Sequence, residues 1–76
     1  MATQADYIAQ VHAELVRAQT KHPTPMRSTH EGYGILLEEV DEMFDAIKGN
    51  DLTAARKEAV QVAAMAVRFL VDSEKF

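Results

Sequence analysis

The sequence predicts an all-α chain of three helices, in which the second and third form a central antiparallel helical hairpin. Two observations support this class. Residues that interrupt helices cluster in only two places, at His22-Pro23-Thr24-Pro25 and at Gly49-Asn50-Asp51. Between these places apolar residues recur every three or four positions, as they do on one face of a helix. No segment resembles a linker between domains, so residues 1–76 are expected to form one domain.

The first helix is expected from about Thr3 to Lys21, because the prolines that follow prevent its continuation. One face of this helix carries Ala5, Ile8, Val11, Leu15 and Val16. His12 lies on the same face, where a core or interface histidine is more common than a metal ligand.

The second helix is expected from about Thr29 to Lys48. Ser28, with Glu31 three residues later, has the pattern of a capping box. Gly32 and Gly34 each weaken the first turn by about 1 kcal/mol relative to alanine, which suggests that another part of the chain packs close to it. The apolar arc of this helix comprises Tyr33, Leu36, Leu37, Val40, Met43, Phe44 and Ile47.

The third helix is expected from about Leu52 to Val71 and is apolar nearly all round. Its main arc comprises Ala55, Ala59, Val62, Met65, Ala66 and Phe69, and a second arc comprises Val60, Ala64, Val67 and Val71. Such a helix is normally buried, and three short helices cannot easily cover both arcs. We therefore expect a homodimer or higher homo-oligomer that completes a helical bundle, most simply by packing the third helix against its copy.

Composition limits the function further. The absence of cysteine excludes disulfides and thiolate zinc sites, so a chain of 76 residues needs a partner subunit, a carboxylate-bound metal or both. A net charge of −4 argues against binding to a nucleic-acid polymer. No signal peptide pattern precedes the first helix and no apolar run is long enough to cross a membrane, so the expected compartment is the cytoplasm.

Carboxylates are the residues with the clearest chemical pattern. Glu39 lies beside the apolar arc of the second helix, with Glu42 about 60° further round, whereas the neighbouring Glu38 points more nearly to solvent. A solvated acidic face would explain this segment alone. Glu58, however, projects into the main apolar arc of the third helix, where a carboxylate is rarely buried unless it is paired or bound to a metal.

Sequence distances from the turn at Asn50 predict that the carboxylates of the two helices lie close together. Glu42 and Glu58 are each eight residues from Asn50, and Glu39 and Gln61 are each eleven residues from it. In an antiparallel hairpin, residues at equal distances from the turn lie at one level, and spacings of three lie on one helix face. Like charges held so close repel unless a cation lies among them. Ligands that are all oxygen favour Mg²⁺, or Mn²⁺ by similarity.

The segment from His30 to Asp72, 43 of the 76 residues, resembles the MazG-like all-α nucleoside triphosphate pyrophosphohydrolases. That family carries Glu-Glu-x-x-Glu on one helix and Glu-x-x-Asp on the next. Glu38-Glu39-Val40-Asp41-Glu42 matches the first motif, and Glu58-Ala59-Val60-Gln61 matches the second except at its last position. The residues around both motifs are similar to those of small family members that bacteriophages often carry.

The resemblance implies Mg²⁺-dependent hydrolysis of nucleoside triphosphates to monophosphate and pyrophosphate. It implies that Glu39, Glu42 and Glu58 are catalytic metal ligands, that Gln61 is a neutral fourth ligand, and that Glu38 supports them. Nucleoside triphosphate would be the partner molecule. The expected substrate contacts are His30 and Lys57, and the other cations available for phosphate are Lys21, Arg27, Lys48, Arg56 and Arg68.

Gln61 departs from the family pattern, because the family has aspartate at this position. An amide oxygen can coordinate a cation, but more weakly than a carboxylate. The alternative interpretation is a non-catalytic MazG-like helical module that binds nucleotide, metal or a protein partner.

Overall fold

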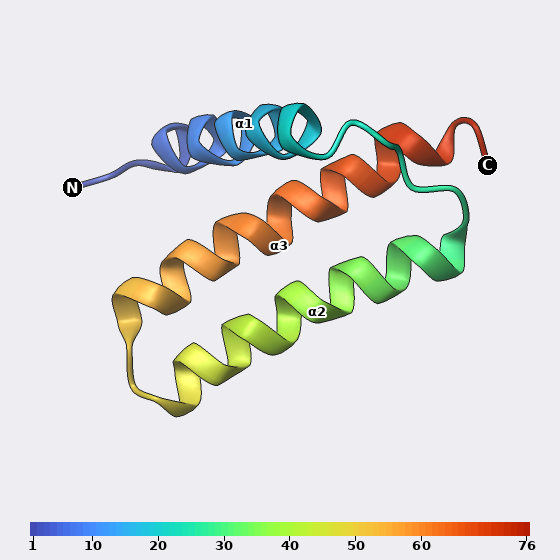
Figure 1. Cartoon of the computed structure of the whole chain (residues 1–76). Coiled ribbons are helices and arrows are strands. Elements are labelled where there is room, and N and C mark those ends of the chain that lie inside the picture. Colours follow the sequence, from blue (N-terminus) through green and yellow to red (C-terminus); the bar gives the residue numbers. More distant parts are fainter.

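The computed structural model describes residues 1–76 and contains three helices and no strand (Figure 1). Helix α1 spans Gln4–Lys21, α2 spans Thr29–Lys48 and α3 spans Leu52–Ser73. The all-α class and the three helices predicted from the sequence are therefore confirmed. No helix combines the length and the apolar character that crossing a membrane requires.

Side-chain caps explain where the helices begin. Ser28 Oγ accepts the N–H of Glu31 (3.1 Å) at α2, and Asp51 accepts the N–H of Ala54 (3.0 Å) at α3. The capping box expected at Ser28 is only half formed, because the Glu31 carboxylate accepts a hydrogen bond from Arg27 instead. A complete capping box forms at Thr3, at the start of α1.

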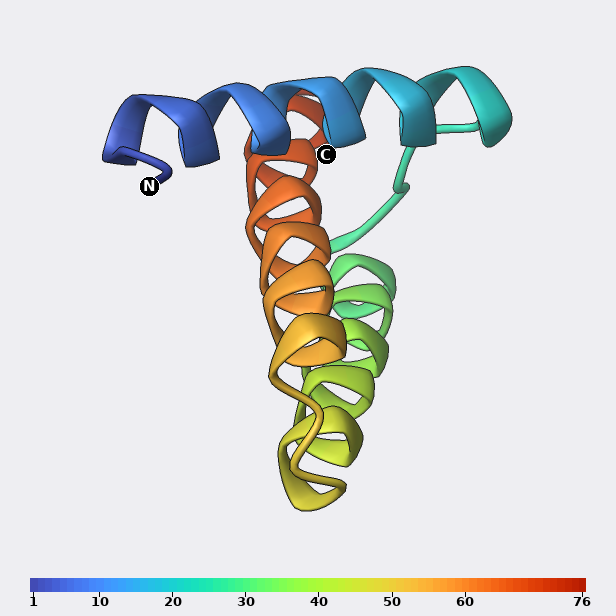
Figure 2. The ribbon, with the colours of Figure 1, turned by 90° about the vertical axis from the view of Figure 1, so that its left-hand side faces the viewer.

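Helices α2 and α3 lie side by side and run in opposite directions, and α1 lies across α3 (Figures 1 and 2). In the turn between α2 and α3, Asn50 has the left-handed conformation (φ 56°), which asparagine tolerates better than most residues. The first half of α1 projects beyond the α2–α3 pair (Figure 2). The backbone of α1 lies close to α3 and not to α2, although Ile35 and Leu36 of α2 pack against the core cluster to which α1 contributes.

The core lies where α1 crosses α3. Leu15 and Ala18 of α1 pack with Ala64 and Met65 of α3, and Ala64 is completely buried. An alanine at the crossing point allows the two helix axes to approach closely. Because α1 covers Ala64, the centre of the second apolar arc of α3 is buried within the chain.

Arg68 fastens the segment between α1 and α2 to α3. Its guanidinium is buried and donates hydrogen bonds to the carbonyl oxygens of His22 (2.7 Å) and Thr24 (3.1 Å). It also pairs with Asp72 (3.4 Å), whose carboxylate accepts the backbone N–H of Met26 (3.0 Å). Arg68 therefore has a structural role in this chain and is not a free cation for phosphate.

The start of α2 is packed closely at one glycine and open at the other. A Cβ added at Gly32 would lie 2.4 Å from the ring of Phe69, whereas nothing lies within 4 Å of a Cβ added at Gly34. Close packing was expected at the start of this helix, and it is present at Gly32 but not at Gly34.

The apolar arc predicted for α2 faces the core only in part. Leu36 and Met43 are partly buried against the rest of the chain. The other five members, Tyr33, Leu37, Val40, Phe44 and Ile47, are exposed. His12, expected in a core or an interface, is exposed on α1.

Candidate metal centre

Three carboxylates meet between α2 and α3. Glu39 and Glu42 come from α2 and Glu58 from α3, and each offers an oxygen that lies within 4.8 Å of the other two. Spacing of three residues places Glu39 and Glu42 on one side of α2. Glu39 and Glu58 are partly buried, and Glu42 is exposed, so the cluster is open to solvent on one side.

The cluster is electrostatically strained without a counter-ion. Burial raises the pKa of Glu58, and the nearby charge of Glu42 raises it further. Burial likewise raises the pKa of Glu39, with further contributions from Glu42 and Glu58. One oxygen of Glu58, Oε2, is buried and has no hydrogen-bond partner in the chain. A buried acceptor without a partner costs about 1–3 kcal/mol, and more if it is charged.

A hard divalent cation fits this arrangement. Two oxygens on opposite sides of one Mg²⁺ are about 4 Å apart, so small rotations of the three side chains would bring their oxygens to one ion. All three donors are carboxylate oxygens, which Mg²⁺ and Mn²⁺ prefer. A cation would also give Glu58 Oε2 the partner that the protein does not supply.

A cavity of about 330 Å³ opens beside Glu39, the one carboxylate of the cluster that lines it. Glu39 and Gln61 line it from α2 and α3, and the last turns of α1 form the opposite wall. The cations on this wall are Arg17 and Lys21, with the buried Arg68 behind them. Acidic and basic groups therefore share one small cavity, which suits a ligand that carries phosphate together with a divalent cation.

A second and larger cavity, of about 570 Å³, lies on the other side of Gln61. It runs between α1 and the first half of α3 and contains Arg17, Arg56 and Lys57. Gln61 lines both cavities and is therefore placed between them.

Glu14 and Arg17 of α1 are site residues that the sequence analysis missed. Both line the two cavities, and Arg17 Nε donates to Glu14 Oε2 at 2.9 Å. Arg17 holds the pKa of Glu14 below its usual range, with a smaller contribution from the amide of Gln61. Distances from the turn at Asn50 relate only the second and third helices, so they could not place residues of the first. The spacing of Glu14 and Arg17, one turn apart beside Leu15, was the available signal.

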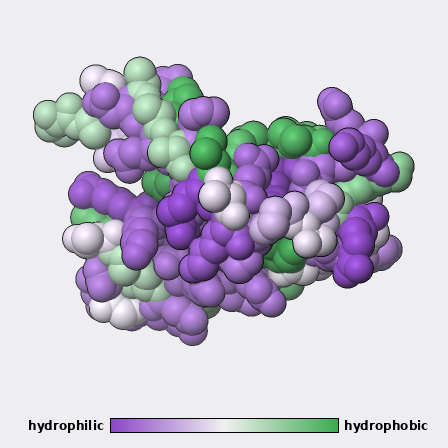
Figure 3. Space-filling view, turned by 45° about the horizontal axis from the view of Figure 1, so that its top comes forward, coloured by the Kyte–Doolittle hydropathy of each residue, from purple (hydrophilic) through white to green (hydrophobic).

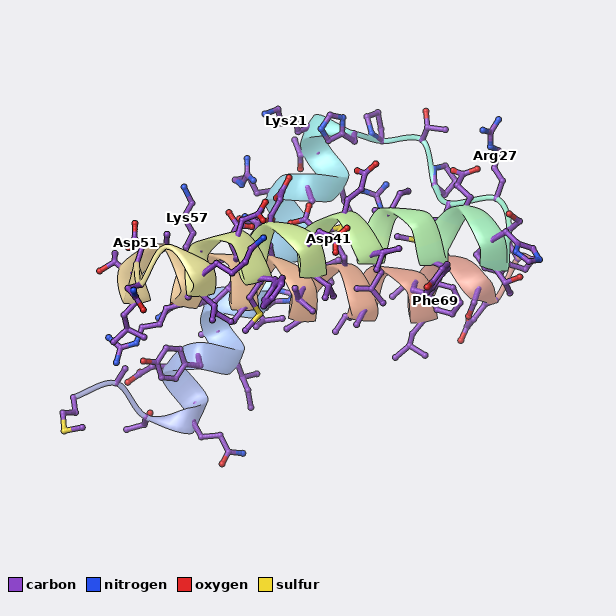
Figure 4. All side chains as sticks on the ribbon, turned by 90° about the horizontal axis from the view of Figure 1, so that it is seen from below. Lys21, Arg27, Asp41, Asp51, Lys57 and Phe69 are labelled. Carbon is purple, nitrogen blue, oxygen red and sulfur yellow. The ribbon has the colours of Figure 1, made fainter.

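The remaining predicted site residues lie at different distances from the cluster. Lys57 is exposed in the larger cavity, and its charge partly offsets the raised pKa of Glu58. Figure 4 shows Lys57, on α3, and Lys21, at the end of α1, on the same side of the molecule. Glu38 is exposed and lies outside the cluster. His30 is exposed at the start of α2, about 14 Å along the helix axis from Glu39, and lines neither cavity.

Two further cations proposed for phosphate are engaged elsewhere. Arg27 pairs with Glu31 (3.0 Å), and Lys48 pairs with Asp45 (3.3 Å) while lying over the ring of Phe44. Hydrophilic side chains dominate the face of the molecule seen in Figure 3. The cations that line a cavity without an ion pair are Lys21 in the smaller cavity and Arg56 and Lys57 in the larger, whereas Arg17 lines both cavities while paired with Glu14.

Comparisons with protein-family models, with curated proteins and with solved structures find no match for this chain.

Proposed function

We propose that the protein hydrolyses nucleoside triphosphates to the monophosphate and pyrophosphate with the help of Mg²⁺ or Mn²⁺. The observation that carries the proposal is the buried, unpartnered oxygen of Glu58 among three carboxylates whose oxygens approach within 4.8 Å. The resemblance of both acidic motifs to the MazG-like family supports it. In this reaction a water oxygen bonds to the α-phosphorus, and the bridging oxygen leaves with pyrophosphate.

Glu39, Glu42 and Glu58 would hold the cation in this proposal. When bound, the cation neutralises phosphate charge and lowers the pKa of coordinated water. Arg17 and Lys21 would attract the phosphates from the opposite wall of the smaller cavity, and Lys57 would do so from the larger cavity. Glu42, the most exposed of the three carboxylates, leaves one side of the cluster accessible to substrate. His30 is too far along α2 to share this role.

Gln61 favours a second candidate, a helical module that binds metal or nucleotide without catalysis. Its side chain brings no negative charge to the cluster, and it lies close enough to Glu14 to lower the pKa of that carboxylate. An amide engaged in this way is a weaker cation ligand than an aspartate.

We also propose that the working form is a cytoplasmic homo-oligomer, which the exposed apolar side chains of α2 favour.

The adjacent residues Glu38 and Glu39 provide a matched test of the metal centre. Glu39→Gln should lower the rate of pyrophosphate release by about 100-fold or more, as expected for loss of a metal ligand. It should also remove most of the thermal stabilisation by Mg²⁺. Glu38→Gln, which removes the same charge from an exposed position, should leave both close to those of the wild type. Equal effects of the two substitutions would argue against this metal centre.

A panel of canonical nucleoside triphosphates at saturating Mg²⁺ separates the two candidate functions. Pyrophosphate release that depends on Glu39 supports the enzyme. Mg²⁺ binding that depends on Glu39, without release of pyrophosphate from any nucleotide, supports the binding module. Gln61→Asp adds a fourth carboxylate and should tighten Mg²⁺ binding by calorimetry, by about tenfold if the new group coordinates the ion.

A further inference from the structure

Gln61 brings an amide to a site that otherwise consists of carboxylates. It lies one turn from Glu58 on α3 and lines the smaller cavity together with Glu39. The two halves of an amide act differently on a cation, because the carbonyl oxygen can coordinate it whereas the NH₂ group is only a donor. The orientation of the Gln61 side chain therefore decides whether this residue strengthens or weakens a metal centre.

The nearest carboxylate of the cluster along α3 does not receive the NH₂ group of Gln61. Glu58 could accept a hydrogen bond from it, yet Glu58 Oε2 is buried without a partner. Burial and the charge of Glu42 raise the pKa of Glu58, and Gln61 does not lower it. The donor half of the amide is therefore not used to relieve the strain at Glu58.

Glu14 of α1 is the carboxylate that the amide does affect. Glu14 lines both cavities, as Gln61 does, and the amide lowers the pKa of Glu14. An ionised carboxylate is only an acceptor, so the half of the amide that stabilises its charge is the NH₂ group. The carbonyl oxygen is bonded to the same carbon and diverges from the nitrogen, so it is left free of Glu14.

The surroundings of Glu14 keep its carboxylate in one place. Its side chain is only 14% exposed, and both of its oxygens accept hydrogen bonds from the guanidinium of Arg17, one of them from Nε at 2.9 Å. Such two-point pairing fixes a carboxylate better than a single hydrogen bond does. The next residue, Leu15, belongs to the core where α1 crosses α3, so the backbone that carries Glu14 is also held relative to α3.

We propose that Glu14 is a positioning residue of the metal centre, which holds the NH₂ group of Gln61 and leaves its carbonyl oxygen free to coordinate the cation. This role rests on the proposed function, because it requires the metal centre formed by Glu39, Glu42 and Glu58. Groups that orient a metal ligand from outside the coordination sphere typically change metal affinity by about 10–100-fold.

A double-mutant cycle in Mg²⁺ affinity tests this role. Glu14→Met and Gln61→Met should each weaken Mg²⁺ binding about tenfold in calorimetry. Because Glu14 acts through Gln61, the double variant should bind Mg²⁺ no more weakly than Gln61→Met alone. A charge that acts directly on the cation would weaken binding in both backgrounds, so a further tenfold loss in the double variant would overturn the proposal.

Glu31 provides a matched control. It also lines the smaller cavity and also pairs with an arginine one turn away, at 3.0 Å from Arg27 Nε. It lies about 12 Å along α2 from Glu39, and Figure 4 shows Arg27 at the opposite end of the molecule from Lys57. Glu31→Met should therefore leave the Mg²⁺ affinity close to that of the wild type. Equal losses from Glu14→Met and Glu31→Met would show an effect of net charge alone and would overturn the proposal.

The side-chain amide resonances of Gln61 give a measurement that needs no metal. They are identified by their absence from the spectrum of Gln61→Met. Glu14→Met should shift them, and Glu31→Met should not; resonances that do not respond to Glu14→Met would contradict the contact. Glu14→Ala takes the place of Glu14→Met if circular dichroism shows a loss of helix, because alanine has the highest helix propensity.

Failure of the proposed function would look different from failure of this positioning role. If the metal centre is wrong, the wild type and Glu39→Gln bind Mg²⁺ equally weakly, although the Gln61 resonances still respond to Glu14→Met. That result would overturn the role of Glu14 at the cation together with the metal centre. If only the positioning role is wrong, Mg²⁺ binding depends on Glu39 and does not change in Glu14→Met.

Discussion

The two sides of the α2–α3 pair have different surroundings, and a different kind of partner would stabilise each of them. On one side, the end of α1 and the segment after it form the wall of a polar cavity around Glu39 and Gln61. On the other side, large apolar residues of α2 face solvent. The acidic side concentrates like charges, which a cation stabilises, and the apolar side exposes surface that a second apolar surface removes from water. Helix α2 contributes to both sides, because its carboxylates and its exposed apolar residues lie on different faces of the helix.

The largest expected loss of stability comes from replacing Arg68, which anchors the segment that forms one wall of the cavity on the acidic side. Arg68→Met would take away the hydrogen bonds to the carbonyls after α1 and leave Asp72 buried without its cation. Breaking a buried pair in this way typically costs about 3–5 kcal/mol. Urea unfolding should show this loss, whereas Arg56→Met, which changes an exposed arginine of the same helix, should have little effect. Similar stability of the two variants would contradict the anchoring role of Arg68.

Substitutions at two glycines of α2 should change stability by smaller amounts and in opposite directions. One glycine lies on the packed side of the helix and the other on its open side. Gly32→Ala forces a methyl group against the ring of Phe69 and should destabilise the fold by about 1–3 kcal/mol. Gly34→Ala meets no neighbour and should stabilise α2 by up to about 1 kcal/mol, because alanine is the better helix former. Thermal unfolding of both variants measures the difference. Stabilisation by both substitutions would show that Phe69 can move aside at little cost.

The smallest expected effect is a pH dependence of the metal-free protein that originates on the acidic side. Because the pKa values of Glu39 and Glu58 are raised above the ordinary 4.5, the folded chain binds more protons than the unfolded chain between that value and the raised pKa. Stability should therefore fall as pH rises through this window. Glu14, whose pKa is lowered, acts in the opposite sense and only below 4.5.

Melting temperatures in chelator should accordingly be higher at about pH 5 than at neutral pH. Glu58→Gln removes one of the responsible carboxylates, so it should reduce this dependence and leave the metal-free protein at least as stable at neutral pH. Mg²⁺ should raise the melting temperature of the wild type at neutral pH and have little effect on this variant. A wild-type protein that is most stable at neutral pH in chelator would argue against strain in the cluster.

Much of the local structure could be read from the sequence, because its causes are local. The prolines at 23 and 25 and the caps Ser28 and Asp51 determine where helices stop and start. The helix ends expected from these signals lie within two residues of those observed. The position of Glu42 and Glu58 at equal distances from Asn50 likewise depends only on helix geometry and one short turn, and the structure places these carboxylates together.

Other features depended on how α1 docks, which no local signal specifies. Periodicity identifies which residues are apolar, but the element that covers them depends on the path of the segment between α1 and α2. That path places Glu14 and Arg17 beside Gln61, and it turns Arg68 from a free cation into a buried anchor. Docking of α1 on α3 also covers Ala64 and leaves large apolar residues of α2 exposed. The sequence by itself therefore determined the helices and the level at which their carboxylates meet. Only the tertiary structure decided which faces are covered, because burial depends on contacts between residues far apart in the chain.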